Sequence, residues 1–351
     1  MSTLLDELQR TVQTPIRFNE EAILASIEKE NGRQSLPVKI LSIFGGILAS
    51  ITFLAFLLTT GLYDTAIGLS VSGITISALA ILLSRHYDQI IWDTISITAY
   101  IIGVFLIVIG CSQWNINETV ISMICIVMAA TSLRLAKNYI MALIPVLMID
   151  GAVLTIIFTN NIPNLIHLHV SALALTLTYL ILNEARLIAR RNSLSLLYKP
   201  IRTGILISFL SGLAILGNKM LLTISPAYIW ISAAVMIFII VYLLSLLMTT
   251  LNITVRRTKI VIYALSIASL CTTALSPAIT GALLILLLSV GANYKTGIAA
   301  GIVSFIYFVA QYYYDMSLTL LTKSILLMAT GLLFLSLYLL IRKKDTSHEE
   351  I

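Results

Sequence analysis

Apolar residues run through this chain in stretches of about 13 to 24, separated by short polar connections. A helix needs about 20 mainly apolar residues to cross a bilayer, so this pattern predicts an all-α fold, a polytopic transmembrane helical bundle of about twelve spans. The predicted spans are Ile40–Leu62, Ala66–Leu83, Ile90–Gly110, Thr119–Leu133, Ile140–Phe158, Leu165–Leu182, Ile205–Leu222, Tyr228–Met248, Ile260–Leu275, Ala278–Val290, Gly297–Tyr313 and Leu318–Ile341. The fourth, ninth and tenth are the shortest.

The basic residues give an independent test of this number of spans. Lysine and arginine accumulate in the cytoplasmic connections of membrane proteins. If the N-terminus is cytoplasmic and twelve helices alternate, all of the 22 basic residues except Lys219 and Lys323 fall on the cytoplasmic side. A wrong number of helices would scramble this alternation, so we expect both termini to be cytoplasmic.

The same pattern predicts the organisation of the chain. Residues 1–39 form a cytoplasmic segment with a short amphipathic helix, residues 40–341 the transmembrane domain and residues 342–351 a cytoplasmic tail. The basic connection 183–204 divides the transmembrane domain into 40–182 and 205–341. Two interpretations of it remain open, a junction between two structural repeats and a long cytoplasmic hairpin.

Composition supports the membrane assignment. The chain is 59% hydrophobic and 11% charged, whereas soluble domains are about 25% charged. The net charge of +6 is spread over the connections, which argues for topology and against nucleic acid as a partner. The N-terminal 39 residues lack the apolar core of a signal peptide. The expected environment is the lipid bilayer.

Few residues carry recognisable chemistry. The three cysteines show no metal-ligand or redox spacing, and no nucleotide-binding or hydrolase motif is present, so we expect no cofactor and no metal. His167 and His169 are two residues apart and therefore do not share a helix face, so a metal site there would need further ligands. An intramembrane enzyme is the least favoured hypothesis, because no nucleophile and base form a visible pair.

Asp150 is the most conspicuous acid, because it lies near the middle of the fifth predicted span. A carboxyl group at that depth must be protonated or must find a partner. One interpretation is a proton or cation relay site. The other is a neutral acid that hydrogen-bonds to a neighbouring helix.

The last predicted hairpin carries a second group of polar residues. In its first helix Gly297, Gly301, Ser304, Phe308, Gln311 and Asp315 share one face, and in its second Thr319, Thr322, Lys323 and Thr330 share another. Two such stripes would form a polar vestibule on the outer side. The structural alternative is an interfacial belt of Tyr312, Tyr313 and Tyr314, a helix cap at Asp315 or Ser317 and a lysine that reaches the surface.

The segment YYYDMSLTLLTKS, which ends at Ser324, resembles a signature of the domain-of-unknown-function 4401 family of bacterial membrane proteins. A second similarity covers Leu36-Pro37 to Phe44-Gly45-Gly46 and Ala49, and the polytopic layout between them agrees. The resemblance implies an inner-membrane protein associated with a small membrane-anchored protein that bears a GDYxxLxY motif. It marks these positions: Tyr312, Tyr313, Asp315, Thr319, Leu320, Leu321, Lys323 and Ser324.

Two functional hypotheses follow, and neither defines an oligomeric state. In the first, the protein is the membrane component of a two-component envelope complex and binds its partner around Tyr312–Ser324. In the second, it is a secondary transporter of a small polar or anionic solute, with Asp150 as the protonatable coupling residue and Asp315 and Lys323 in the vestibule.

Overall fold

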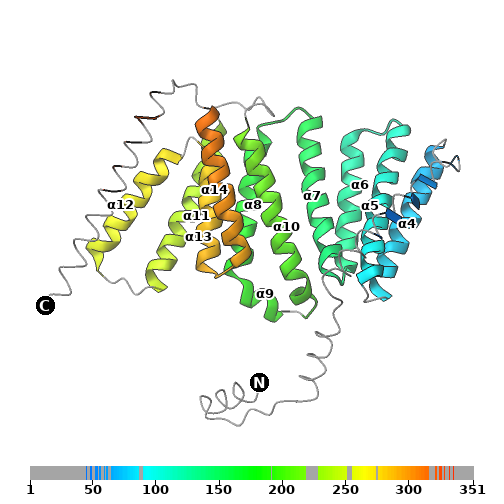
Figure 1. Ribbon diagram of the computed structural model, residues 1–351, viewed down its shortest axis with the longest axis horizontal. Coiled ribbons are helices and arrows are strands. Elements are labelled where there is room, and N and C mark those ends of the chain that lie inside the picture. The colour runs from blue at the N-terminus through cyan, green and yellow to red at the C-terminus, as the bar shows by residue number, and fades with distance from the viewer. Residues whose placement is uncertain are drawn as a thin grey trace, which may run out of the picture. The chain divides into compact units, whose positions relative to one another are not determined.

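The computed structural model describes residues 65–86, 90–190, 192–218, 228–250, 255–273 and 276–315, together with single residues between 45 and 61 and between 321 and 335. The described residues form helices and turns and contain no strand (Figure 1). The prediction of an all-α fold is confirmed for this part of the chain. The first and last predicted spans and the N-terminal segment lie mostly or wholly outside the described residues.

Two compact units divide the chain, Met1–Ile107 and Val108–Ile351. The first contains α4, Ala66–His86, and most of α5, Ile90–Gln113. The second contains the remaining helices, α6 (Glu118–Leu135), α7 (Tyr139–Thr159), α8 (Leu165–Leu182), α9 (Glu184–Arg190), α10 (Asn192–Gly217), α11 (Ile229–Thr250), α12 (Arg256–Thr273), α13 (Pro277–Gly291) and α14 (Lys295–Asp315).

Eight of the described helices are long and apolar enough to cross a membrane. They are α4, α5, α6, α7, α8, α10, α11 and α14, and α13 is a shorter apolar helix of 15 residues. The prediction of a polytopic membrane protein therefore stands on the structure. The total of twelve spans stays a prediction, because not all of the chain is described.

The predicted spans and the observed helices agree closely in several places and differ at one junction. Helix α8 has the predicted bounds, Leu165–Leu182. Helix α10 begins at Asn192, 13 residues before the predicted start at Ile205, and α9 precedes it. The predicted connection 183–204 is therefore largely helical. Basic residues such as Lys199 lower the hydropathy of a segment, so the predicted membrane span does not extend over them. Lysine and arginine are nevertheless good helix formers, and the helix itself continues through them.

Asparagine forms three of the turns between helices. Asn115, Asn161 and Asn293 have φ values of 54°, 53° and 51° and follow α5, α7 and α13. After α7, Ile162 N donates to Ile157 O at 3.1 Å, and the other two turns repeat this bond. Left-handed asparagine with this bond is a Schellman motif, which ends a helix and reverses the chain.

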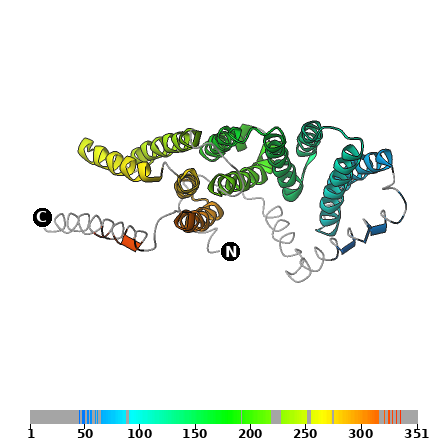
Figure 2. The same ribbon diagram turned by 90° about the horizontal axis from the view of Figure 1, so that it is seen from above.

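The core of the second unit lies among α8, α10, α11, α13 and α14. Figure 2 shows α13 and α14 side by side. Their close approach has a sequence cause, since a Cβ atom at Gly301 would lie 3.0 Å from the Cα atom of Leu286. The predicted face of Gly297, Gly301, Ser304 and Phe308 is buried. At Gly301 it is packed against α13.

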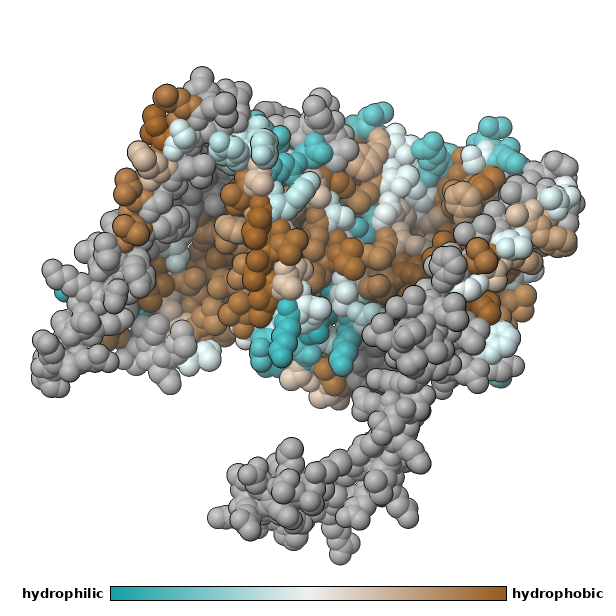
Figure 3. Space-filling model, in the orientation of Figure 1, coloured by the Kyte–Doolittle hydropathy of each residue, from teal (hydrophilic) through white to brown (hydrophobic). Residues whose placement is uncertain are grey.

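Charge is segregated between the two ends of the helices in the second unit. Every described lysine and arginine of this unit lies at the end where α8 and α13 finish and α7, α10 and α14 begin. We call this the basic end. Figure 3 shows a hydrophobic band over α13 and α14 with hydrophilic residues beyond it. The opposite end carries Glu118 and Asp315 as its described acidic residues.

In the first unit, α4 and α5 are held together by small residues. A Cβ atom at Gly73 would lie 2.6 Å from the carbonyl oxygen of Gly103, and one at Gly103 would lie 2.8 Å from the carbonyl oxygen of Gly73. Backbone contacts this close require glycine on both helices. An apolar cavity of about 310 Å³ lies in the same unit, lined by residues including Phe53, Leu83 and Ile102.

Candidate functional site

Asp150 is the one acidic residue that is buried within the described spans. It is the twelfth residue of α7, and 8% of its surface is exposed. Helix α7 remains continuous through the buried Pro145, which lies five residues before Asp150. The sequence thus places a carboxyl group near the middle of a membrane-spanning helix, and the structure keeps it away from the surface.

Two neighbouring helices provide partners for this carboxyl group. His169 Nε2 on α8 lies 2.8 Å from Asp150 Oδ1, and the hydroxyl of Ser211 on α10 donates to Asp150 Oδ2 at 3.3 Å. The same hydroxyl lies 2.8 Å from the carbonyl oxygen of Ser208, so its proton is shared between two acceptors. Asp150, His169 and Ser211 form a cluster that joins α7, α8 and α10, and we call it the Asp150 cluster.

The Asp150 cluster can hold a proton. The side chains of His169 and Asp150 are only 13% and 9% exposed, so an uncompensated charge on either is costly. With one proton between them the pair is neutral overall, as an acid beside an imidazole or as a carboxylate beside an imidazolium. Without that proton it carries a net negative charge. One proton at this pair is therefore the arrangement that leaves no net charge buried.

His167 faces a different helix from His169, as their spacing predicts. Its Nδ1 atom lies 2.9 Å from the hydroxyl of Ser232 on α11, and 1% of the residue is exposed. Its Nε2 atom is buried and has no hydrogen-bond partner in the structure. The two histidines therefore do not form a common site, and no group of three or more histidine, cysteine, aspartate or glutamate residues gathers among the described residues.

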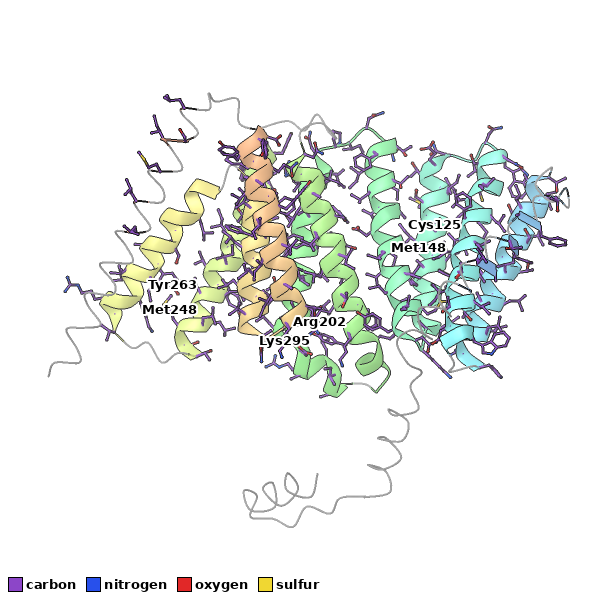
Figure 4. The ribbon with its side chains drawn as sticks, viewed as in Figure 1. Cys125, Met148, Arg202, Met248, Tyr263 and Lys295 are labelled. Carbon is purple, nitrogen blue, oxygen red and sulfur yellow. The ribbon has the colours of Figure 1, made fainter. Side chains whose placement is uncertain are left out.

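A second polar cluster lies at the basic end. Arg202 on α10 donates to Glu184 on α9 at 3.1 Å, and its guanidinium lies 3.8 Å from the ring centroid of Tyr294 and 5.2 Å from that of Tyr198. The hydroxyl of Tyr198 also donates to Leu180 O on α8. We call Glu184, Tyr198, Arg202 and Tyr294 the Arg202 cluster. Figure 4 shows Arg202 and Lys295 at the same end of the helices.

The residues predicted around the last hairpin are only partly described. Gln311 Nε2 donates to Gly217 O at 3.1 Å and so joins α14 to the end of α10. Tyr312 packs against the core, Tyr313 and Tyr314 make an edge contact, and Asp315 is exposed. The hydroxyl of Ser324 donates to Leu321 O at 2.9 Å. Thr319 and Lys323 lie outside the described residues, so the predicted vestibule stays a prediction.

Sequence reasoning identified Asp150 and did not identify its partners. In the sequence His169 stands out only as a possible metal ligand, and Ser211 carries no signal of its own. One signal was present in the sequence, because α7 and α8 are joined by only five residues and both carry a group able to hold a proton. A short connection between two helices makes them antiparallel neighbours, which brings such groups within reach.

The comparisons with known proteins give one match. A family model described as "Domain of unknown function (DUF4401)" matches residues 35–344. No curated protein and no solved structure matches the chain.

Proposed function

The chain belongs to the DUF4401 family, and from that premise we propose that it is a secondary transporter of the bacterial inner membrane in which Asp150 is the protonatable coupling residue. The observation that carries this proposal is the 2.8 Å contact between His169 Nε2 and Asp150 Oδ1 inside the membrane-spanning helices. Ionisable residues at that depth are costly and mark ion or proton pathways in many membrane proteins.

Charge distribution supports an orientation for this transporter. The basic end of the second unit corresponds to the cytoplasmic side, because lysine and arginine accumulate there. Helices α7, α10 and α14 then run outward and α8 and α13 run inward. With the predicted spans Ile40–Leu62 and Leu318–Ile341 added, the proposal is twelve spans with both termini in the cytoplasm.

The Asp150 cluster suits coupling better than it suits a purely structural role. A leucine or valine at these positions would pack three helices together without the cost of burying polar groups. A proton-binding pair adds something that apolar packing does not, namely a charge that changes when a proton arrives. Coupled transport requires such a group between the two sides of the membrane.

The test is a proton-binding current. The full-length protein is reconstituted in liposomes on a solid-supported membrane, and the external pH is stepped from 7.5 to 6.5. The wild type is expected to give a transient charge displacement as a proton enters the buried pair. Asp150→Asn is expected to reduce this displacement at least tenfold, because the amide holds no proton in this range.

Glu118→Gln is the matched control. Glu118 is also an acid bonded to α7, since Thr159 donates to it at 2.9 Å, but it is exposed at a helix end. Its replacement should leave the displacement unchanged. An Asp150→Asn protein that is folded and keeps the full wild-type current would contradict the proposal.

The second candidate function is the envelope complex that the family resemblance implies. One observation favours it, since Tyr314 is 78% exposed at the outer end of α14, where the signature begins. A pull-down of the tagged protein from its native membrane tests it, with Lys323→Met and Tyr314→Ala as variants. A small membrane-anchored partner that is lost from both variants supports this function, and its retention by both refutes the predicted binding site.

A further inference from the structure

The Asp150 cluster has a charge character that bears on what it binds. Asp150 is the one charged side chain among the buried polar residues, and the described arginine and lysine residues of the second unit lie at the basic end. The groups that hydrogen-bond to the carboxylate in the structure are the imidazole of His169 and the hydroxyl of Ser211. These described surroundings offer an anion no fixed positive charge.

Helix α10 carries a second serine, Ser208, one turn before Ser211. Ser208 and Ser211 are three residues apart and so share one face of α10. The hydroxyl of Ser208 is buried, with 1% of the residue exposed, and has no hydrogen-bond partner in the structure. Together with the carboxylate of Asp150, these hydroxyls supply hard oxygen ligands, which suit alkali-metal and ammonium-type cations better than soft metals.

The number of acidic side chains in the Asp150 cluster determines the charge of the ligand that it can neutralise. One carboxylate neutralises one positive charge, and at membrane depth a surplus charge is costly. No group of three or more histidine, cysteine, aspartate or glutamate residues gathers among the described residues, and the bonds to Asp150 come from a histidine and a serine. A divalent ion would therefore keep an uncompensated charge, whereas a monovalent cation or a proton would leave the cluster neutral.

The geometry points to a monovalent cation as the ligand that exchanges with the proton at the Asp150 cluster, and this inference rests on the function proposed above. Asp150 Oδ1 already contacts His169 Nε2, so a cation that takes this oxygen must displace the shared proton. The proton leaves to water as the cation binds, and it returns when the cation departs. Mutual exclusion at one carboxylate produces exchange of the cation for a proton.

The structure brings no other titratable group of the described helices α6, α8 and α10 into hydrogen-bonding contact with Asp150. Helix α6 carries Glu118 and Arg134 at its two ends and Cys125 between them, and α10 carries Arg202 at the basic end. Figure 4 shows Cys125 on α6 at the level of Met148 on α7. Within α8, His167 is directed to Ser232 on α11. His169 is thus the one ionisable group on these helices that the structure brings into contact with Asp150.

The experiment measures protons released when a cation binds. The full-length protein is kept in a non-ionic detergent at pH 7.5 with little buffer and a pH-sensitive dye. Sodium chloride or methylammonium chloride is added as the monovalent probe, choline chloride as a bulky cation, and sodium-free lactate and phosphate salts as anionic probes. We expect sodium or methylammonium to release about one proton per protein in the wild type and in Glu118→Gln, and none in Asp150→Asn.

The outcomes separate this inference from the function on which it rests. Release by sodium alone identifies a metal cation as the ligand, and release by methylammonium alone identifies an amine. Ser208→Ala should weaken the apparent affinity of the effective cation several-fold while the total release of protons stays the same.

No release of protons by either cation, with an Asp150-dependent pH-step current intact, overturns the inference and leaves the proposed function standing. A response to lactate or phosphate that Lys323→Met abolishes also overturns it.

Discussion

The contact between Asp150 and His169 leads to a measurable coupling energy. We expect a double-mutant cycle of Asp150→Ala and His169→Ala to show that the two side chains stabilise the folded protein together. His169→Ala alone leaves a buried carboxyl group without its nearest partner, and Asp150→Ala leaves a buried imidazole without its own. The double variant removes both costs, so its loss of stability should be smaller than the sum of the single losses.

The size of this coupling follows from the geometry. The two atoms are 2.8 Å apart and the two side chains are 13% and 9% exposed. Hydrogen bonds that involve a charged group contribute about 1.5–3 kcal/mol in proteins. We expect a coupling in that range. His167 provides the matched control, because it lies two residues away on α8 and contacts Ser232 instead. The cycle of Asp150 with His167 should give less than about 0.5 kcal/mol.

The assay is reversible unfolding in mixed micelles of dodecyl sulfate and a non-ionic detergent, followed by tryptophan fluorescence. Trp230 lies in α11 of the second unit, which packs against α8, the helix that carries His169. Equal coupling energies for His169 and His167, or a value near zero for His169, would refute the assignment of this contact as the bond that holds the three helices together.

Four further substitutions should separate packing from chemistry. Gly103→Ala should destabilise the protein by about 1–3 kcal/mol because its Cβ atom meets the backbone of α4, while Gly151→Ala, with open space around it, should stabilise by up to about 1 kcal/mol. Arg202→Lys should cost about 1–2 kcal/mol, because a lysine keeps the charge and loses the planar contact with Tyr294. Gln311→Leu should cost about 0.5–1.5 kcal/mol through the lost bond to the end of α10, and leave the pH-step current intact. All four are checked in the same unfolding assay, and equal effects for the two glycine variants would contradict the packing of α4 on α5.

Hydropathy predicted most of the described helices because burial in lipid depends on composition, which the sequence displays directly. It placed the start of α10 too late, at Ile205, because it counts Lys199 and Arg202 as the end of a span. Both residues continue the helix beyond the apolar stretch. The structure shows Arg202 covered by tyrosine rings, a contact between segments more than 90 residues apart that composition does not encode.

The sequence alone identifies Asp150 as a candidate site residue, but it does not identify the residues that bond to it. Asp150 is conspicuous because a charged residue interrupts an apolar stretch, which is a local property. The pairing with His169 and Ser211 depends on the rotation of three helices about their axes and on their relative depth. Those quantities result from packing, for example the approach of Gly204 on α10 to Val146 on α7. Local sequence patterns do not contain them.

The depth of Asp150 also gives the proposed transporter an electrical property. The residue lies about eleven positions after the start of α7 and about nine before its end, or ~16 and ~14 Å along a helix. A proton that reaches it from either side crosses about half of the span. A full crossing corresponds to about 2.3 kcal/mol per 100 mV, so half of a uniform field changes the free energy of proton binding by about 1.1 kcal/mol. The proton-binding constant of Asp150 would then change roughly sevenfold per 100 mV, which makes the site responsive to the membrane potential as well as to the proton concentration.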